Sequence, residues 1–254
     1  KMAEFNSAEN LNMNLAENRS TDVMTGGLDE RMFLYFRLSG SMKKADRVDI
    51  IVSFLMESGV KMILKDLDQA LQRGAKIRIL TGNYLGITQP SALYLIKRKL
   101  GDQVDLRFYN DPKRSFHPKA YMFHYATYSE MYIGSSNVSR SALTSGIEWN
   151  YRFNSKTDPE SYQKFYETFE DLFEHHSTVI DEAELKRYSK NWHRPAVAKD
   201  LDKYDQEDVQ DTNVRMIYEP RGAQIEVLCA LEATRAEGAK RALVQAATGV
   251  GKTC

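Results

Sequence analysis

The sequence predicts an α/β fold in which a mixed β-sheet is flanked by helices on both faces. Three largely apolar, β-branched runs, at residues 47–55, 76–81 and 104–109, are typical of buried strands. Two segments with apolar residues at helical spacing, 59–73 and 89–100, separate them. Because the two patterns alternate along the chain, we expect a layered α/β domain.

Local signals justify the elements of the first half in order. A helix is expected at 28–45, and a buried strand follows at 47–55 with the sequence RVDIIVSFL. The helix at 59–73 ends at Gly74, as expected for a C-terminal glycine. A strand at 76–81 (KIRILT) precedes a helix at 89–100, which has Pro90 in its first turn, and a strand at 104–109.

The second half predicts shorter strands and one long helix. Strands are expected at 118–123 and 131–133 around a turn, then a short helix at 138–143 and a strand at 147–153. The last element is a helix at 159–175. Its apolar stripe is Tyr162, Phe165, Tyr166, Phe169, Leu172 and Phe173. A base-stacking surface is one interpretation of this stripe, but the spacing is that of a buried helix face, so we expect core packing.

Composition bounds the class of protein. The 254 residues carry 35 basic and 35 acidic side chains, so a DNA-binding surface would have to be a local patch. The two cysteines, Cys229 and Cys254, cannot build a disulfide framework and favour a reducing compartment, so we expect the cytoplasm. No apolar run approaches the ~20 residues that span a bilayer, and we expect no membrane partner.

Four regions follow from patterning. Residues 1–27 form a polar leader without the apolar core of a signal peptide. The α/β domain spans 28–192, and a charged linker follows at 193–213. The last region, 214–254, predicts a helix at 223–237 and a strand at 241–245 (RALVQ) before ATGVGKT. Since a folded domain is not expected to stop there, we interpret the sequence as the front end of a longer protein.

A first constellation of chemical residues lies between Ser115 and Trp149. It comprises HPK at 117–119, GSSN at 134–137, and Glu148. In a strand, His117 and Lys119 would share one face, where an imidazole could attack phosphorus and an ammonium hold a phosphate oxygen. The turn offers small residues for close phosphate approach, and Glu148 could fix the tautomer of the histidine. Each feature alone is compatible with an ordinary surface.

The combination resembles the active-site motif of the phospholipase D superfamily. The matching residues, in order, are His117, Lys119, Gly134, Ser135, Asn137 and Glu148. The resemblance covers about residues 28–175. One departure is His124, which stands where the family motif has an aspartate, and we expect it to be a structural histidine. The spacer between Lys119 and Gly134 is also slightly long, which a longer turn at 125–130 would absorb.

The resemblance implies a metal-independent phosphodiesterase with a phosphohistidine intermediate. The family needs two HxK motifs per active site, and this sequence holds one. A homodimer with a shared centre is therefore implied, in which one His117 is the nucleophile and the other is the general acid.

A second constellation, ATGVGKT at 247–253, resembles the phosphate-binding loop of superfamily 2 helicases. In that resemblance Gly249, Gly251, Lys252 and Thr253 contact ATP and Mg²⁺, and Gln224 contacts adenine. The later motor motifs are missing, so ATP hydrolysis is expected only in a full-length protein. A phospholipase D-type domain fused to such a motor indicates DNA, as in restriction-type or DNA-repair helicases of bacteria.

Three functional hypotheses remain open. The first is the nuclease domain of a helicase-associated DNA-processing enzyme, with Lys113, Arg114 and Arg140 contacting DNA. The second is a lipid phosphodiesterase or phosphatidyl transferase. The third is a non-catalytic DNA-binding or dimerisation module that keeps the same fold. Cleavage assays on DNA and on lipid would separate the three.

Overall fold

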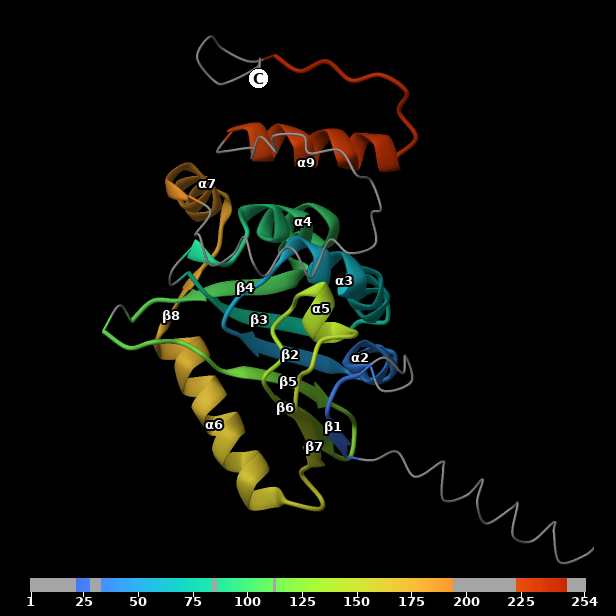
Figure 1. The fold of residues 1–254 in the computed structure, drawn as a ribbon, viewed down its shortest axis with the longest axis vertical. Coiled ribbons are helices and arrows are strands. Elements are labelled where there is room, and N and C mark those ends of the chain that lie inside the picture. The colour runs from blue at the N-terminus through green and yellow to red at the C-terminus, as the bar shows by residue number, and fades with distance from the viewer. Residues whose placement is uncertain (1–21, 28–32, 84–85, 112, 194–222, 246–254) are drawn as a thin grey trace, which may run out of the picture.

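The structure is a computed structural model of the chain, and it describes residues 22–27, 33–83, 86–111, 113–193 and 223–245. A mixed sheet of eight strands forms its centre, in the order β1-β7-β6-β5-β2-β3-β4-β8 (Figure 1). The strands are β1 (Val23–Met24), β2 (Arg47–Val52), β3 (Lys76–Gly82), β4 (Val104–Tyr109), β5 (Lys119–His124), β6 (Ser129–Gly134), β7 (Asn150–Asn154) and β8 (Ser177–Val179). β2, β3 and β4 are parallel and the other pairings are antiparallel, which confirms the predicted mixed sheet.

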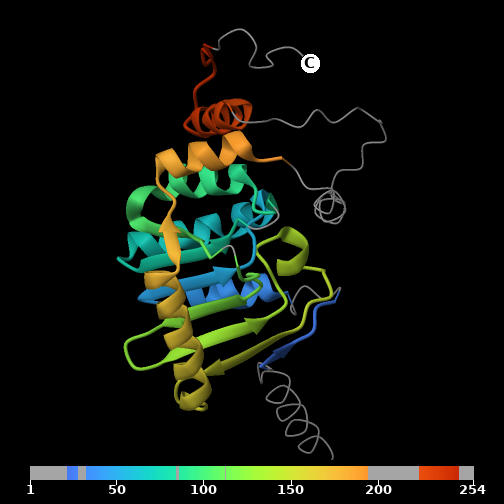
Figure 2. The same cartoon turned by 90° about the vertical axis from the view of Figure 1, so that its left-hand side faces the viewer.

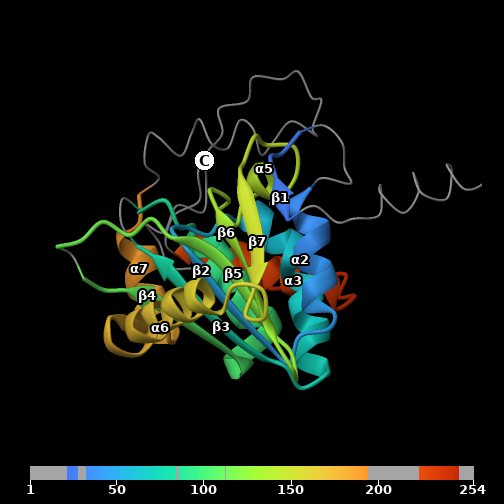
Figure 3. The same cartoon turned by 90° about the horizontal axis from the view of Figure 1, so that it is seen from below.

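Helices cover both faces of the sheet, as predicted. The helices are α2 (Leu34–Met42), α3 (Glu57–Gln72), α4 (Pro90–Leu100), α5 (Arg140–Leu143), α6 (Pro159–His175), α7 (Glu182–Asn191) and α9 (Ala223–Ala236), with a 3₁₀ turn at Gly101–Gln103. Figure 3 shows α6 on one side of the sheet and α2 and α3 on the other. The alternation of β2 explains both layers, because Val48 and Ile50 pack toward α3, whereas Ile51 packs toward α6.

The periodic elements lie where the sequence predicts them, with small shifts at their ends. The long helix occupies Pro159–His175 as expected, and its side chains Tyr162, Phe169 and Phe173 are buried against the sheet. The prediction that this aromatic stripe packs into the core is therefore confirmed, except for Phe165, whose side chain is 45% exposed. The helix predicted at 28–45 is shorter than expected, because Phe33 has an extended backbone and α2 runs from Leu34 to Met42; residues 28–32 lie outside the described part.

Three elements escaped prediction. β1 and β8 are two and three residues long, too short to show a periodic pattern. α7 buries only Leu185 and Ser189, so its sequence lacks an apolar stripe. Each is positioned by its sheet or helix neighbours rather than by its own composition.

The C-terminal helix α9 packs against α4 and α7 (Figures 1 and 2). It matches the helix predicted at 223–237, and its Ile225, 5% exposed, joins the hydrophobic core of the sheet domain. The strand predicted at 241–245 is wrong, because these residues form no regular structure and Leu243 is 96% exposed. Within the described residues no strand pairs with this segment, so its apolar pattern has no ladder to join.

Candidate active site

The residues predicted for phosphoryl chemistry gather at one edge of the sheet, which we call the site edge. Lys119 opens β5 and pairs with Val52, the last residue of β2. Gly134 closes β6 and pairs with Asn150, the first residue of β7. The connections that carry His117, Asn137 and Glu148 therefore all lie at this edge, on four neighbouring strands.

The ammonium of Lys119 is held in place by two acceptors. Its Nζ donates to Ser53 Oγ at 2.9 Å and to the carbonyl oxygen of His117 at 2.7 Å. Burial lowers the pKa of Lys119 below its ordinary value, and the nearby charge of Glu148 opposes that effect. Since an ammonium has three donors, one remains for an incoming oxygen.

His117 is exposed and lies in the loop that precedes β5. The expectation that it shares a strand face with Lys119 is wrong, because β5 begins at Lys119 itself. The two residues are linked instead through the His117 carbonyl. This contact fixes the backbone from which the imidazole projects.

Ser135 connects the turn after β6 to the segment before β7. Its backbone N–H donates to the Trp149 carbonyl at 3.0 Å, and its Oγ accepts from the Trp149 N–H at 3.0 Å. The same hydroxyl donates to the carboxylate of Glu148. Ser135 thus positions Glu148 at the site edge, whereas a role for Glu148 in orienting His117 stays a prediction.

Gly134 is required by packing within the protein. A Cβ at this position would lie 2.1 Å from the carbonyl oxygen of Trp149 and 2.6 Å from Oδ1 of Asn150. The structure therefore gives a different reason for the glycine than close approach of a phosphate. Any side chain here would push β7 away from β6.

Asn137 is 7% exposed, and its Oδ1 accepts from the Phe54 N–H at 3.1 Å. That contact ties the turn to the end of β2 and leaves the amide nitrogen as the donor end. The sequence did not single out Ser53, Ser136 or Asn150, although Asn150 Nδ2 donates to Ser136 Oγ at 2.9 Å. Ser53 and Asn150 fell inside the strands predicted at 47–55 and 147–153, whereas Ser136 belongs to the GSSN turn, whose small polar residues were the available signal.

The candidate DNA contacts occupy connections at the same edge. Lys113 and Arg114 are exposed in the connection between β4 and β5. Arg140 opens α5, and its backbone N–H donates to Ser58 Oγ at 3.3 Å. All three therefore lie in connections at the same edge of the sheet as Lys119.

His124 lies at the far end of β5 and is part of a buried ionic cluster. Its Nε2 lies 2.8 Å from Oδ2 of Asp49, and its Nδ1 lies 3.0 Å from Ser129 Oγ. Arg78 contacts both oxygens of Asp49, at 2.7 and 2.9 Å, and also binds Glu170 of α6. These contacts give His124 a structural role, as expected from the sequence.

The electrostatics of this cluster favour the ionised carboxylate. Burial acts to raise the pKa of Asp49, but hydrogen bonds from Arg78 and His124 outweigh it, and the pKa lies below its ordinary value. The Arg47 Nε is 3.2 Å from Oδ2 of Asp49, yet it makes no hydrogen bond, so its contribution is charge alone.

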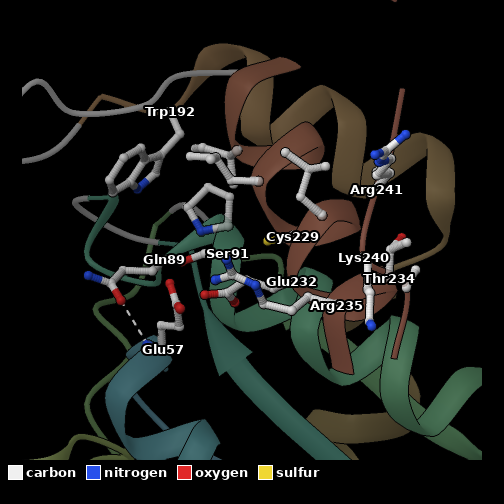
Figure 4. A pocket seen from close by; sticks show the side chains of 16 residues that line it. Glu57, Gln89, Ser91, Trp192, Cys229, Glu232, Thr234, Arg235, Lys240 and Arg241 are labelled. Carbon is white, nitrogen blue, oxygen red and sulfur yellow. Dashed lines mark hydrogen bonds between the residues drawn. The ribbon is translucent and has the colours of Figure 1, made fainter. Parts of the chain in front are cut away.

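The candidate nucleotide residues are only partly described. Gln224 is the second residue of α9, whereas Gly249, Gly251, Lys252 and Thr253 lie outside the described residues. A cavity of about 630 Å³ lies between α9, the start of α4 and Trp192 (Figure 4). Neither Gln224 nor any residue proposed for phosphoryl chemistry lines it.

The described residues offer neither a metal site nor a membrane-spanning helix. They contain no group of three or more His, Cys, Asp or Glu side chains placed to hold a metal ion. Among the described helices, none combines the length and the apolar character needed to cross a bilayer.

Comparisons with known proteins give one matching family and several similar folds. No curated protein matches the sequence. Solved structures with a similar fold include NucT from Helicobacter pylori (15% identity, 62% of this chain and 97% of that chain, TM-score 0.48). Nuc from Salmonella typhimurium, a phospholipase D family member, has 18% identity over 63% of this chain and 98% of that chain, with TM-score 0.48.

Phosphatidylserine synthase from Haemophilus influenzae Rd KW20 shares 15% identity over 73% of this chain and 45% of that chain, with TM-score 0.50. These identities are low, so the likeness concerns the fold alone. Residues 39–176 match the family described as cardiolipin synthase, PLD-like domain. Since this match covers more than half of the 254 residues, the chain belongs to the phospholipase D-like domain family.

Proposed function

We propose that the chain is a metal-independent phosphodiesterase that cleaves DNA in a homodimeric active site. The observation that carries this proposal is the Lys119 ammonium, held by Ser53 and by the His117 backbone with one donor left for a phosphate oxygen. His117 of the same motif is exposed beside it, so an imidazole can reach a phosphorus bound there.

The proposed reaction has two steps. The imidazole nitrogen of His117 attacks phosphorus, the bond to the leaving oxygen breaks, and protonated His117 of the partner subunit gives that oxygen its proton. Water then attacks the phosphohistidine, loses a proton to the partner's His117, and the phosphorus–nitrogen bond breaks. Lys119 and the amide nitrogen of Asn137 stabilise the negative charge on the non-bridging oxygens.

The test is cleavage of single- and double-stranded DNA in excess EDTA. Wild type is compared with His117→Ala and with His176→Ala, a matched control whose histidine lies outside the site and pairs with Asp171. We expect cleavage to survive EDTA and to vanish only in His117→Ala, with a particle of twice the chain mass in light scattering. Loss of cleavage in EDTA, or full activity of His117→Ala, would contradict the mechanism.

A lipid substrate is the second candidate, and one observation favours it. The matching family is described as cardiolipin synthase, PLD-like domain. Release of head groups from phosphatidylglycerol or cardiolipin vesicles, assayed with the same variants, would support this candidate if DNA stays intact. The basic side chains of Lys113, Arg114 and Arg140 at the site edge make DNA our first choice.

A non-catalytic DNA-binding or dimerisation module is the third candidate. His124 in place of the family's aspartate is the feature that leaves room for it. Binding of DNA by the dimer, without cleavage of DNA or lipid under any condition, would select this candidate.

We also propose that residues 214–254 begin a superfamily 2 helicase motor. Support comes from the sequence, in which Gln224 precedes the loop carrying Gly249, Gly251, Lys252 and Thr253. ATP and Mg²⁺ would bind only in a longer chain that carries the remaining motor motifs, and the whole protein would act in DNA restriction or repair. DNA-stimulated ATP hydrolysis that is lost in Lys252→Ala of such a chain is the expected result.

A further inference from the structure

A row of exposed apolar side chains starts at the candidate active site and follows β7. Ile147 is 85% exposed, Trp149 is 72% exposed and Tyr151 is 51% exposed. The three occupy alternate positions. Trp149 directly precedes β7 and is bonded to the turn after β6, since the Ser135 N–H donates to the Trp149 carbonyl and the Trp149 N–H donates to Ser135 Oγ, each at 3.0 Å. Trp149 and Tyr151 are two positions apart, the spacing at which side chains of an extended chain lie on one side.

The backbone of Trp149 is anchored to the site. Both backbone groups of Trp149 bond to Ser135, and the hydroxyl of Ser135 also binds the carboxylate of Glu148. Trp149 thus directly follows a residue of the proposed catalytic set, on a backbone that the site itself fixes.

The next rings extend this row into the core. Tyr151 stacks on Phe153, with centroids 6.0 Å apart and planes 15° apart, and Phe153 contacts Phe165 of α6 at 6.0 Å. Phe153 is only 6% exposed. The exposed ring of Tyr151 therefore rests on a buried one and loses little freedom when a flat ligand covers it.

We propose that Trp149 and Tyr151 are a stacking platform for unpaired bases, and that they direct the site to single-stranded nucleic acid. The inference rests on the proposed function, because it places the cleaved phosphate at Lys119 and His117. Aromatic side chains beside a basic surface are the usual means of holding single strands. The cations Lys113, Arg114 and Arg140 at the site edge supply the charge that flanking phosphates require.

Spacing separates single strands from duplexes. Alternate residues of a strand are about 6.6 Å apart, whereas bases in a duplex are stacked about 3.4 Å apart. Two rings on alternate residues can each cover a base only when the bases are unstacked. A duplex keeps its base faces covered and can offer only its backbone to this surface.

The proposed homodimer brings the partner subunit to His117, so a second copy of the chain is the competing occupant of the neighbouring surface at Trp149 and Tyr151. A stable protein interface takes about 20–30 residues a side. The exposed large apolar residues of β1, β7 and its lead-in are Val23, Ile147, Trp149 and Tyr151, a small set that would form only part of an interface of that size. We therefore assign the platform to bases and leave the second copy as an outcome of the test.

The experiment measures binding in a His117→Ala background, so that a failure of the cleavage mechanism does not affect it. Fluorescence anisotropy compares a 12-nucleotide oligothymidylate, an abasic strand of the same length and a 12-base-pair duplex. The variants are Trp149→Ala, Trp149→Phe and Tyr151→Ala. Phe36→Ala is the matched control, since Phe36 is an aromatic residue of α2 that is 51% exposed.

We expect Trp149→Ala to weaken oligothymidylate binding about tenfold, Tyr151→Ala to weaken it by a similar factor, and Trp149→Phe to restore most of it. Binding of the abasic strand and the duplex should change less than twofold, and Phe36→Ala should change nothing. Equal losses on all three nucleic acids, or no binding of oligothymidylate by the His117→Ala parent, would overturn the proposal. A lower particle mass for Trp149→Ala in light scattering would overturn it in favour of the second copy.

Discussion

Replacing Arg78 by alanine tests the view that α6 is fastened to the sheet by a buried ionic cluster. Arg78 is 15% exposed at its side chain, and its partner Asp49 is fully buried at 0%. The guanidinium contacts both oxygens of Asp49 and also Glu170 of α6, and it stacks 4.9 Å from the rings of Phe169 and Phe173. Its loss leaves a carboxylate without its main partner in the interior.

The size of the effect follows from those contacts. Removing one partner of a buried ion pair costs about 3–5 kcal/mol. Asp49 keeps His124 at 2.8 Å and the charge of Arg47, which places the loss at the lower end of that range. The lost stacking on two rings adds about 1 kcal/mol. We therefore expect the free energy of unfolding to fall by about 4 kcal/mol.

Urea unfolding, followed by circular dichroism and compared with wild type, measures this change. Arg187→Ala is the matched control, because Arg187 also pairs with a carboxylate, Glu184, but is 69% exposed. An exposed pair contributes about 1 kcal/mol or less. If Arg78→Ala loses no more stability than Arg187→Ala, the cluster does not fasten α6 and the reasoning is wrong.

Four further changes have definite expected outcomes. Gly134→Ala should destabilise the fold by about 1–3 kcal/mol, since its Cβ would lie 2.1 Å from a carbonyl oxygen. Gly40→Ala, with open space around it, should instead stabilise helix α2 by up to about 1 kcal/mol. Thermal unfolding of the two variants measures both effects. Ser53→Ala removes an acceptor of the Lys119 ammonium, for which we propose a catalytic role, so the cleavage rate should fall about tenfold while the melting temperature stays unchanged. The pKa of Asp49 is lowered by folding, so its stabilisation exists above its unfolded pKa and disappears as pH falls through the folded value; urea titrations from pH 6 to 3 should show a flatter profile for Asp49→Asn. His124→Asp places a second carboxylate beside that of Asp49, so it should destabilise the protein by about 2 kcal/mol at pH 7. Adding Asp49→Asn removes one of the two negative charges and should reverse much of that loss.

Strong periodic patterns made most of the sheet domain predictable. The strand at β3 and the helix at α6 follow from apolar runs whose period is unambiguous. β1 could not be predicted because a two-residue strand shows no alternating pattern. α7 could not be predicted because it buries only two side chains and so shows no apolar stripe. The segment 241–245 shows the opposite failure, in which a strand-like pattern forms no strand because no described strand lies beside it.

The identities in the candidate site were predictable, but the contacts between them were not. His117, Lys119 and Asn137 could be selected from motif spacing, which reflects chemistry. Ser53 could not, because it is 66 residues from Lys119 in the chain and reaches it only through the pairing of β2 with β5. Trp149 could not either, since exposure of a tryptophan depends on which side of the finished sheet remains uncovered.

The departure from the family motif at His124 concerns a different end of the sheet from the proposed chemistry. Lys119 pairs with Val52 at the site edge, and His124 pairs with Arg47 at the start of β2. Five residues of strand separate the two positions by about 17 Å. At that far end the carboxylate is supplied by Asp49 of the neighbouring strand, and the imidazole of His124 binds it. The substitution therefore affects how α6 is held on the sheet rather than the groups that we propose to bind and cleave a phosphodiester.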